Sequence, residues 1–171
     1  MAQDALSKLL SSRDWLMADG ATGTFTVLGN DLNNTLLGNA LANNLQGGAG
    51  NDLLMGMEGN DLLHGEEGAD SLYGNEGNDS LYGGTGADWL YGGSGMDYAD
   101  YSASGFGVSI DLSAGTGLGG DAAGDSLLGV DGLFGSTFDD TLLGYDGEST
   151  TAGDAWTNVF ASLGPRTTGT A

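Results

Sequence analysis

A nine-residue phrase repeats without interruption from Gly47 onward, and it limits what this chain can fold into. The six units read GGAGNDLLM, GMEGNDLLH, GEEGADSLY, GNEGNDSLY, GGTGADWLY and GGSGMDYAD. With the residues of each unit numbered one to nine, positions one and four are always Gly and position six is always Asp. Position eight is Leu until Ala99 ends the run. The units therefore share one local structure, and they must be explained together.

Each unit predicts a tight turn followed by a short strand. Glycine at positions one and four permits positive φ angles and a close approach of neighbouring backbones. Side chains alternate across a strand, so position eight points inward while positions seven and nine point outward. A three-residue strand is not stable alone, so each unit must bury its leucine against the next one in a stack. The predicted inward residues are Leu54, Leu63, Leu72, Leu81 and Leu90.

The repeated aspartates require a cation. Carboxylates stacked at every turn would repel one another, and the chain holds only 3 Lys or Arg against 24 Asp or Glu. Carboxylate and carbonyl oxygens, with no sulfur or imidazole, form a hard-oxygen site whose flexible coordination favours Ca²⁺ over Mg²⁺. The sequence therefore predicts calcium as the cofactor. The predicted ligands are Asp52, Asp61, Asp70, Asp79, Asp88 and Asp97.

Composition excludes several other classes of function. The net charge of −21 disfavours nucleic acid and anionic membrane surfaces as partners. The chain has no Cys, and its only His, His64, is predicted to face outward, so thiol catalysis and histidine metal clusters are excluded. No catalytic motif is present, and we expect no enzyme activity. Neither a signal peptide nor an apolar run of membrane-spanning length is found, so no membrane span is expected.

The phrase resembles the RTX, or haemolysin-type, calcium-binding nonapeptide repeat. The resemblance implies a right-handed parallel β-roll in which two successive units make one turn. Asp52, Asp70 and Asp88 would then form one column and Asp61, Asp79 and Asp97 a second one. Calcium would lie between neighbours within a column, at four sites in all. The family also uses turn carbonyls, and the matching residues at position four are Gly50, Gly59, Gly68, Gly77, Gly86 and Gly95.

The same period begins in weakened form at Gly29. The units GNDLNNTLL and GNALANNLQ place Asn34 and Asn43 at the aspartate position. Because an Asn side chain is a neutral oxygen ligand, these units keep the fold and lose the charge. The mixed pairs Asn34 with Asp52 and Asn43 with Asp61 are candidates for weaker calcium sites. The regular block is predicted to span residues 29–100.

Residues 101–145 are predicted to form an irregular extension of the roll. Val108, Ile110 and Leu112 alternate with polar residues as in a half-buried strand. Further on, Asp125 and Asp140 each stand two residues before a leucine, which repeats the pattern of the nonapeptides. The segment resembles the extension that follows the repeats in secreted serralysin-type proteins. Asp125, Asp139 and Asp140 are candidates for additional calcium ligands.

The two ends of the chain predict short amphipathic helices. Residues 1–28 contain a helical apolar stripe over 2–17, read as a cap on the roll or as a docking helix for another subunit. Residues 146–171 place Trp156, Val159, Phe160 and Leu163 at helical spacing, read as a cap, a secretion signal or both. A protein partner would bind through these helices. The predicted fold is therefore all-β, a right-handed parallel β-roll with short capping helices at both termini.

The predicted function is that of a non-catalytic RTX protein that folds on binding Ca²⁺ outside the cell. The resemblance implies a secreted bacterial protein, exported by type I secretion without a cleaved signal peptide. Two alternatives remain open at this point. One is a structural or adhesive subunit of an extracellular or surface assembly. The other is the calcium-binding tail of a longer secreted enzyme.

Overall fold

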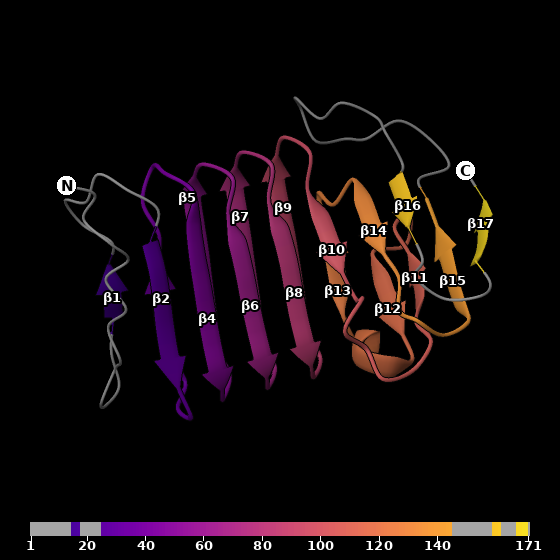
Figure 1. The fold of residues 1–171 in the computed structure, drawn as a ribbon, viewed down its shortest axis with the longest axis horizontal. Helices are drawn as coiled ribbons and strands as arrows, with labels where there is room; N and C mark the ends of the chain where they lie inside the picture. Colours follow the sequence, from indigo (N-terminus) through magenta and orange to yellow (C-terminus); the bar gives the residue numbers. More distant parts are fainter. Residues whose placement is uncertain (1–14, 18–24, 145–158, 162–166, 171) are drawn as a thin grey trace.

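The fold is a β-solenoid, described by a computed structural model for residues 15–17, 25–144, 159–161 and 167–170. Its strands form two sheets that face each other, and the chain passes from one sheet to the other through a turn in each nonapeptide (Figure 1). In these residues the only helical element is a short 3-10 helix, η1 (Gly120–Ala122). No helix among them is long and apolar enough to cross a membrane.

The odd-numbered strands of the regular block lie in the larger sheet, and the even-numbered strands lie in the smaller one (Figure 1). The larger sheet has the order β1 (Trp15–Met17), β3 (Thr35–Leu37), β5 (Leu53–Glu58), β7 (Ser71–Glu76), β9 (Trp89–Ser94), β13 (Ser126–Leu128), β12 (Thr116–Leu118), β11 (Ser109–Asp111), β15 (Asp140–Leu143) and β17 (Thr167–Thr170). The smaller sheet has the order β16 (Val159–Ala161), β14 (Gly132–Phe134), β10 (Tyr98–Asp100), β8 (Ser80–Thr85), β6 (Leu62–Glu67), β4 (Asn43–Ala49) and β2 (Phe25–Asn30).

Strands two units apart pair in parallel, so two nonapeptides make one coil of the solenoid. Leu54 of β5 is in register with Leu72 of β7, and Leu63 of β6 is in register with Leu81 of β8. The period of 18 residues follows from the nine-residue repeat, because consecutive units alternate between the sheets. The predicted parallel roll, with about four coils of regular repeats, is confirmed.

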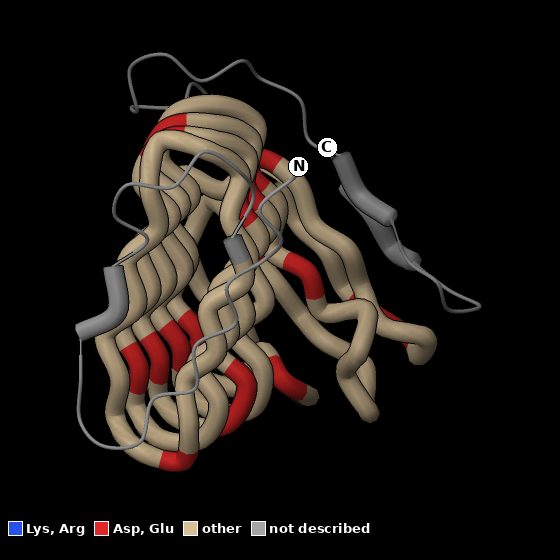
Figure 2. Tube along the Cα trace, turned by 60° about the vertical axis from the view of Figure 1, so that its left-hand side comes forward, with Lys and Arg blue, Asp and Glu red and all other residues tan. Residues whose placement is uncertain are grey.

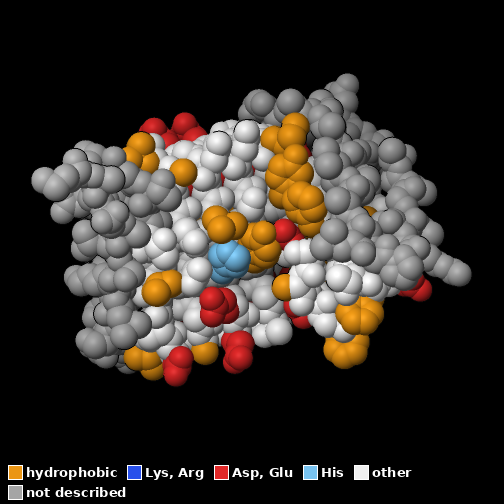
Figure 3. Space-filling model, viewed as in Figure 1, with side chains coloured by type: hydrophobic (Ala, Val, Ile, Leu, Met, Phe, Trp, Pro, Cys, Tyr) orange, Lys and Arg blue, Asp and Glu red, His pale blue; other side chains and the backbone are white. Residues whose placement is uncertain are grey.

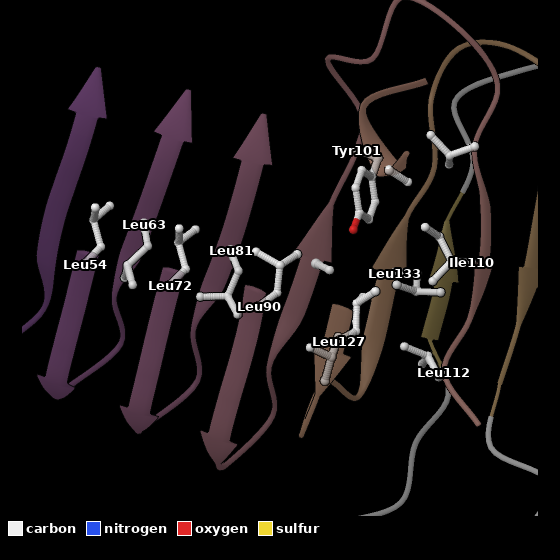
Figure 4. Packing of buried hydrophobic residues seen from close by; sticks show 14 of the residues in the cluster. Leu54, Leu63, Leu72, Leu81, Leu90, Tyr101, Ile110, Leu112, Leu127 and Leu133 are labelled. Atoms are coloured by element: carbon white, nitrogen blue, oxygen red, sulfur yellow. The ribbon is translucent and has the colours of Figure 1, made fainter. Parts of the chain in front are cut away.

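The core is a stack of leucines from both sheets, in the interior of the roll (Figure 4). The predicted inward leucines are fully buried, and the flanking coils continue the stack. Burying a leucine side chain stabilises a fold by about 1.5–3 kcal/mol. Because each leucine contacts the coils on both sides, this stabilisation belongs to the array and not to a single unit. The added members are Val27, Leu36, Leu45, Ala99, Tyr101, Val108, Ile110, Leu112, Ala122, Leu127, Val130, Leu133 and Leu142.

The extension after Asp100 keeps the core but not the parallel topology throughout. Strand β13 continues the larger sheet in parallel with β9, and β11 pairs in parallel with β15. Between them β12 runs antiparallel to both β11 and β13. The predicted strand around Ile110 is confirmed, with Val108, Ile110 and Leu112 buried. A hairpin has thus been inserted into the roll, which lengthens this coil.

The predicted terminal helices are wrong where the structure describes them. Residues 15–17 form β1, which pairs in parallel with β3, and residues 159–161 form β16, which pairs in parallel with β14. The ends of a β-roll present unpaired backbone donors and acceptors, and a strand satisfies them where a helix does not. This pairing outweighs the helical spacing of a few apolar residues. The rest of the two predicted helices lies outside the described residues.

Candidate metal centre

The aspartates at position six stack in two columns, one along each edge of the roll. In the first column the backbone N–H of Asp52 donates to Oδ1 of Asp70 at 2.7 Å, and that of Asp70 donates to Oδ1 of Asp88 at 2.8 Å. The second column repeats this contact from Asp61 to Asp79 at 2.8 Å and from Asp79 to Asp97 at 2.8 Å. Figure 2 shows acidic positions of successive coils lying side by side as stripes. The predicted neighbours are therefore brought together.

Each of these carboxylates is buried, and only one of its oxygens takes part in the ladder. Asp52, Asp61, Asp70, Asp79 and Asp88 are at most 3% exposed. Their Oδ1 atoms accept the hydrogen bonds between coils, whereas their Oδ2 atoms are buried without a hydrogen-bond partner. Buried polar atoms are almost always paired, so a repeated orphan oxygen points to a missing ligand. A cation fits a carboxylate oxygen in this position, and a further hydrogen-bond acceptor does not.

Burial raises the pKa of the stacked carboxyl groups. Desolvation is the main cause, and it raises the pKa of Asp52 and of Asp79 from the ordinary 3.8 to about 6. For Asp88 desolvation, together with the neighbouring charges of Asp125 and Asp70, raises the pKa to about 7. The hydrogen bonds from the backbone of the preceding coil oppose these shifts. Without a cation, the fold therefore favours the protonated acids.

We expect the metal-free protein to become less stable as the pH rises from about 4 to about 7. A carboxyl group whose pKa is raised on folding binds its proton more tightly in the folded state. Its full contribution to the free energy of unfolding is therefore present below the unfolded pKa, about 4. That contribution is lost as the pH rises through the folded pKa, which is about 6 for Asp52 and about 7 for Asp88. Far-ultraviolet circular dichroism of the metal-stripped protein measures the effect, because its β signal should be larger at about pH 4 than at about pH 7. The variant Asp88→Asn should flatten the upper part of the curve. A stability independent of pH would contradict the expectation.

Backbone carbonyls are the other oxygen atoms near the two columns of carboxylates. In the described residues no group of three or more acidic or histidine side chains gathers in a way that could hold a metal alone. The hydrogen bonds that join the regular coils outside the strands end on carbonyls at positions three, six and nine. The position-four carbonyl is not among these acceptors. It points at the position-four glycine of the next coil. Gly50 O would lie 1.7 Å from a Cβ added to Gly68, and Gly59 O would lie 1.5 Å from one on Gly77.

The two asparagines at the start of the columns stand where the sequence predicts. The backbone N–H of Asn34 donates to Oδ1 of Asp52 at 2.7 Å, and that of Asn43 donates to Oδ1 of Asp61 at 2.7 Å. The side-chain amide of Asn43 also donates to Oδ1 of Asp61 at 3.2 Å. This first pair of the second column therefore has a neutral donor that the later pairs of carboxylates lack.

The extension continues both columns, with one residue that the sequence analysis missed. Asp88 N–H donates to Oδ1 of Asp125 at 2.9 Å, and Asp97 N–H donates to Oδ2 of Asp131 at 2.8 Å. Asp131 follows Asp97 by 34 residues instead of 18. Its signal in the sequence is the phrase Asp-x-Leu at residues 131–133, the same phrase that identified Asp125.

The two remaining acidic candidates lie apart from these columns. The neighbour of Asp140 along the roll is Val108, whose N–H donates to Oδ1 of Asp140 at 3.0 Å. The hydroxyl of Ser136 donates to the same oxygen at 2.7 Å. Asp139 is exposed. The structure therefore does not place either residue beside an aspartate of the ladder.

His64 lies on the outer face of the smaller sheet, as the sequence predicts (Figure 3). Its ring stacks on that of Tyr82, with ring centroids 4.4 Å apart. The two residues border a hollow of about 190 Å³ together with Asp100 and Asp121. Burial lowers the pKa of His64 below its ordinary 6.5, so the ring is neutral at physiological pH.

No basic side chain balances the carboxylates in the described part of the chain. Lys8, Arg13 and Arg166 all fall outside it. Figure 2 accordingly shows acidic positions and no basic ones on the described coils. The counter-charge for the two columns must therefore come from solution or from the segments beyond these ranges.

Comparison with known proteins identifies the regular block. The family model described as the RTX calcium-binding nonapeptide repeat, which contains four copies, matches residues 28–63 and again residues 64–99. The two matches cover the repeats that form the regular coils, including the two weakened units. A search of curated proteins finds no match for the chain.

Proposed function

Residues 28–99 of this chain match the model of the RTX calcium-binding nonapeptide repeat, and from this premise we propose that the protein is a calcium-dependent folding module. In this proposal Ca²⁺ binds between successive coils, and its binding drives the metal-free chain into the roll. The proposed ligands are the position-six aspartates from Asp52 to Asp97, with carbonyls at position four completing each site. The module acts without catalysis.

One observation carries this proposal, namely the buried Oδ2 atoms without a partner in both columns. Adjacent carboxylates of one column repel each other in the dry interior, and Asp70 is among the charges that raise the pKa of Asp52. A divalent cation between them would remove the repulsion and would bind the Oδ2 atoms that lack a hydrogen-bond donor. Because the unfolded chain lacks preformed sites, the free energy of binding then appears as free energy of folding.

The place of folding follows from the same linkage. Stabilisation by a ligand grows with its free concentration relative to the dissociation constant. Calcium is scarce in the cytoplasm and plentiful outside the cell, so we propose that the chain is exported unfolded and folds after export. Type I secretion and an extracellular location belong to this proposal.

Calcium titration of the full chain tests the proposal. Starting from chelator excess, far-ultraviolet circular dichroism should show a cooperative gain of β signal as calcium reaches millimolar concentration. Magnesium should not reproduce the gain, because it requires stricter octahedral geometry and gives up its water reluctantly. A spectrum already folded in chelator and indifferent to calcium would refute calcium-driven folding.

A further inference from the structure

The last carboxylate of the first column differs from those before it. In Asp52, Asp70 and Asp88 the Oδ2 atom is buried without a hydrogen-bond partner. In Asp125 the same atom accepts a hydrogen bond from the hydroxyl of Tyr101 at 2.8 Å. Asp125 is as buried as the others, at 2% exposed, so the difference does not arise from access to solvent.

Tyr101 is held in place to make this contact. It follows β10 in the smaller sheet, and its backbone N–H donates to the carbonyl of Phe134 at 2.8 Å. The side chain is 2% exposed, and its ring lies inside the roll with the hydroxyl pointing into the interior (Figure 4). It thus reaches across from one sheet to a carboxylate that precedes β13 in the other.

The chemistry at Asp125 is complete without a metal. Its Oδ1 accepts the N–H of Asp88 at 2.9 Å, as in the regular coils, and its Oδ2 accepts the tyrosine hydroxyl. Burial and the charge of Asp125 raise the pKa of Tyr101 well above its ordinary value, so the hydroxyl keeps its proton as a donor. A charged acceptor that receives two donors is stabilised by both of them.

We propose that the Tyr101 hydroxyl takes the place at Asp125 that calcium takes at the preceding aspartates, so that Asp125 is not a calcium ligand. Calcium binding in the first column then ends at Asp88, and the extension from Tyr101 to Leu143 holds its coil without metal. This inference rests on the proposed function, because it describes where calcium binding stops. It also separates a metal-independent end of the roll from a metal-dependent block.

The number of bound calcium ions tests the assignment of Asp125. Equilibrium dialysis of the full chain should give the same number of Ca²⁺ ions for Asp125→Asn as for the unchanged protein. Asp70→Asn, which alters the same side-chain atom in the middle of the column, should lower that number. A loss of bound calcium in Asp125→Asn would overturn the proposal.

Hydrogen exchange in chelator tests the role of the hydroxyl. The amides of Leu112, Leu127 and Thr141 donate to carbonyls within the extension, so they report on it alone. They should exchange slowly in chelator, and roughly tenfold to hundredfold faster in Tyr101→Phe, because a buried hydrogen bond to a charged group is lost. Tyr98→Phe is the matched control, since the Tyr98 hydroxyl donates to the sulfur of Met96 at 3.1 Å and not to a buried carboxylate, and the exchange should stay unchanged.

The outcomes keep the two proposals apart. Two results would overturn the inference. In the first, the amides of the extension exchange as fast as those of the regular block when the unchanged protein is in chelator. In the second, Tyr101→Phe leaves the exchange of the extension unchanged. The amides of Ser71 and Ser80 donate to Asp52 and Asp61 and report on the regular block. If calcium did not slow the exchange of these two amides, the proposed function would fail. The measurement on the extension is made without calcium, so its result would remain valid.

Discussion

Replacing Asp70 and Asp79 together with Ala is expected to abolish calcium-induced folding. Each residue stands in the middle of its column, where its carboxylate accepts from the coil before and its N–H donates to the carboxylate of the coil after. Every site proposed between neighbouring aspartates would therefore lose one of its two carboxylates. In a calcium titration followed by circular dichroism, the double variant should gain no β signal at millimolar calcium.

The matched control removes the same charge from the same block of repeats. Glu58 and Glu76 are exposed residues at position three, and their replacement with Ala also deletes two carboxylates. This control should fold with nearly the calcium midpoint of the unchanged protein, because exposed charges interact weakly through water and salt. An unchanged calcium midpoint in the double aspartate variant would contradict the assignment of these columns as the calcium sites.

Replacing Gly68 with Ala is expected to cost about 3–5 kcal/mol of folding free energy, from backbone strain and steric overlap together. Gly68 has a φ of 137°, which L side chains rarely adopt. A Cβ there would lie 1.7 Å from the carbonyl oxygen of Gly50, so the two coils would have to move apart. Urea unfolding in saturating calcium should show the loss as a lower midpoint.

Gly105 provides the control for this experiment. It lies in the loop after β10, and a Cβ added to it would meet no atom within 4 Å. Gly105→Ala should therefore change stability by no more than about 0.5 kcal/mol. Equal losses of folding free energy in the two variants would mean that the close stacking of the position-four glycines does not determine the stability of the roll.

The regular coils could be predicted from the sequence because the same nine residues recur. Once Leu54 and Leu72 must both be buried and Asp52 and Asp70 must both occupy a turn, a parallel stack with an 18-residue coil is the arrangement that satisfies every unit at once. Position two was less predictable. Met57, Glu66 and Asn75 adopt φ angles of 78–85°, although glycine would adopt them more easily, because the coils on either side fix the shape of the turn.

The termini and the extension could not be read from spacing. Residues 15–17 and 159–161 belong to apolar stripes with helical spacing, yet they form strands because the roll offers an open edge for pairing. Asp131 joins the second column although it follows Asp97 by 34 residues instead of 18, because the hairpin of β11 and β12 is inserted into the coil between them. No local pattern in the sequence signals these changes in chain length.

The repeat, the buried leucines and the stacked aspartates could be predicted from the amino-acid sequence, because each of these depends on residue type and a fixed period. The carboxylate oxygens that lack a partner, and the places where the columns end, became visible in the folded chain. Tyr101 and Asp125 are 24 residues apart, and their hydrogen bond depends on a coil whose path no periodic rule describes. Local order follows from repetition, whereas the end of an array is set by contacts between segments that do not repeat.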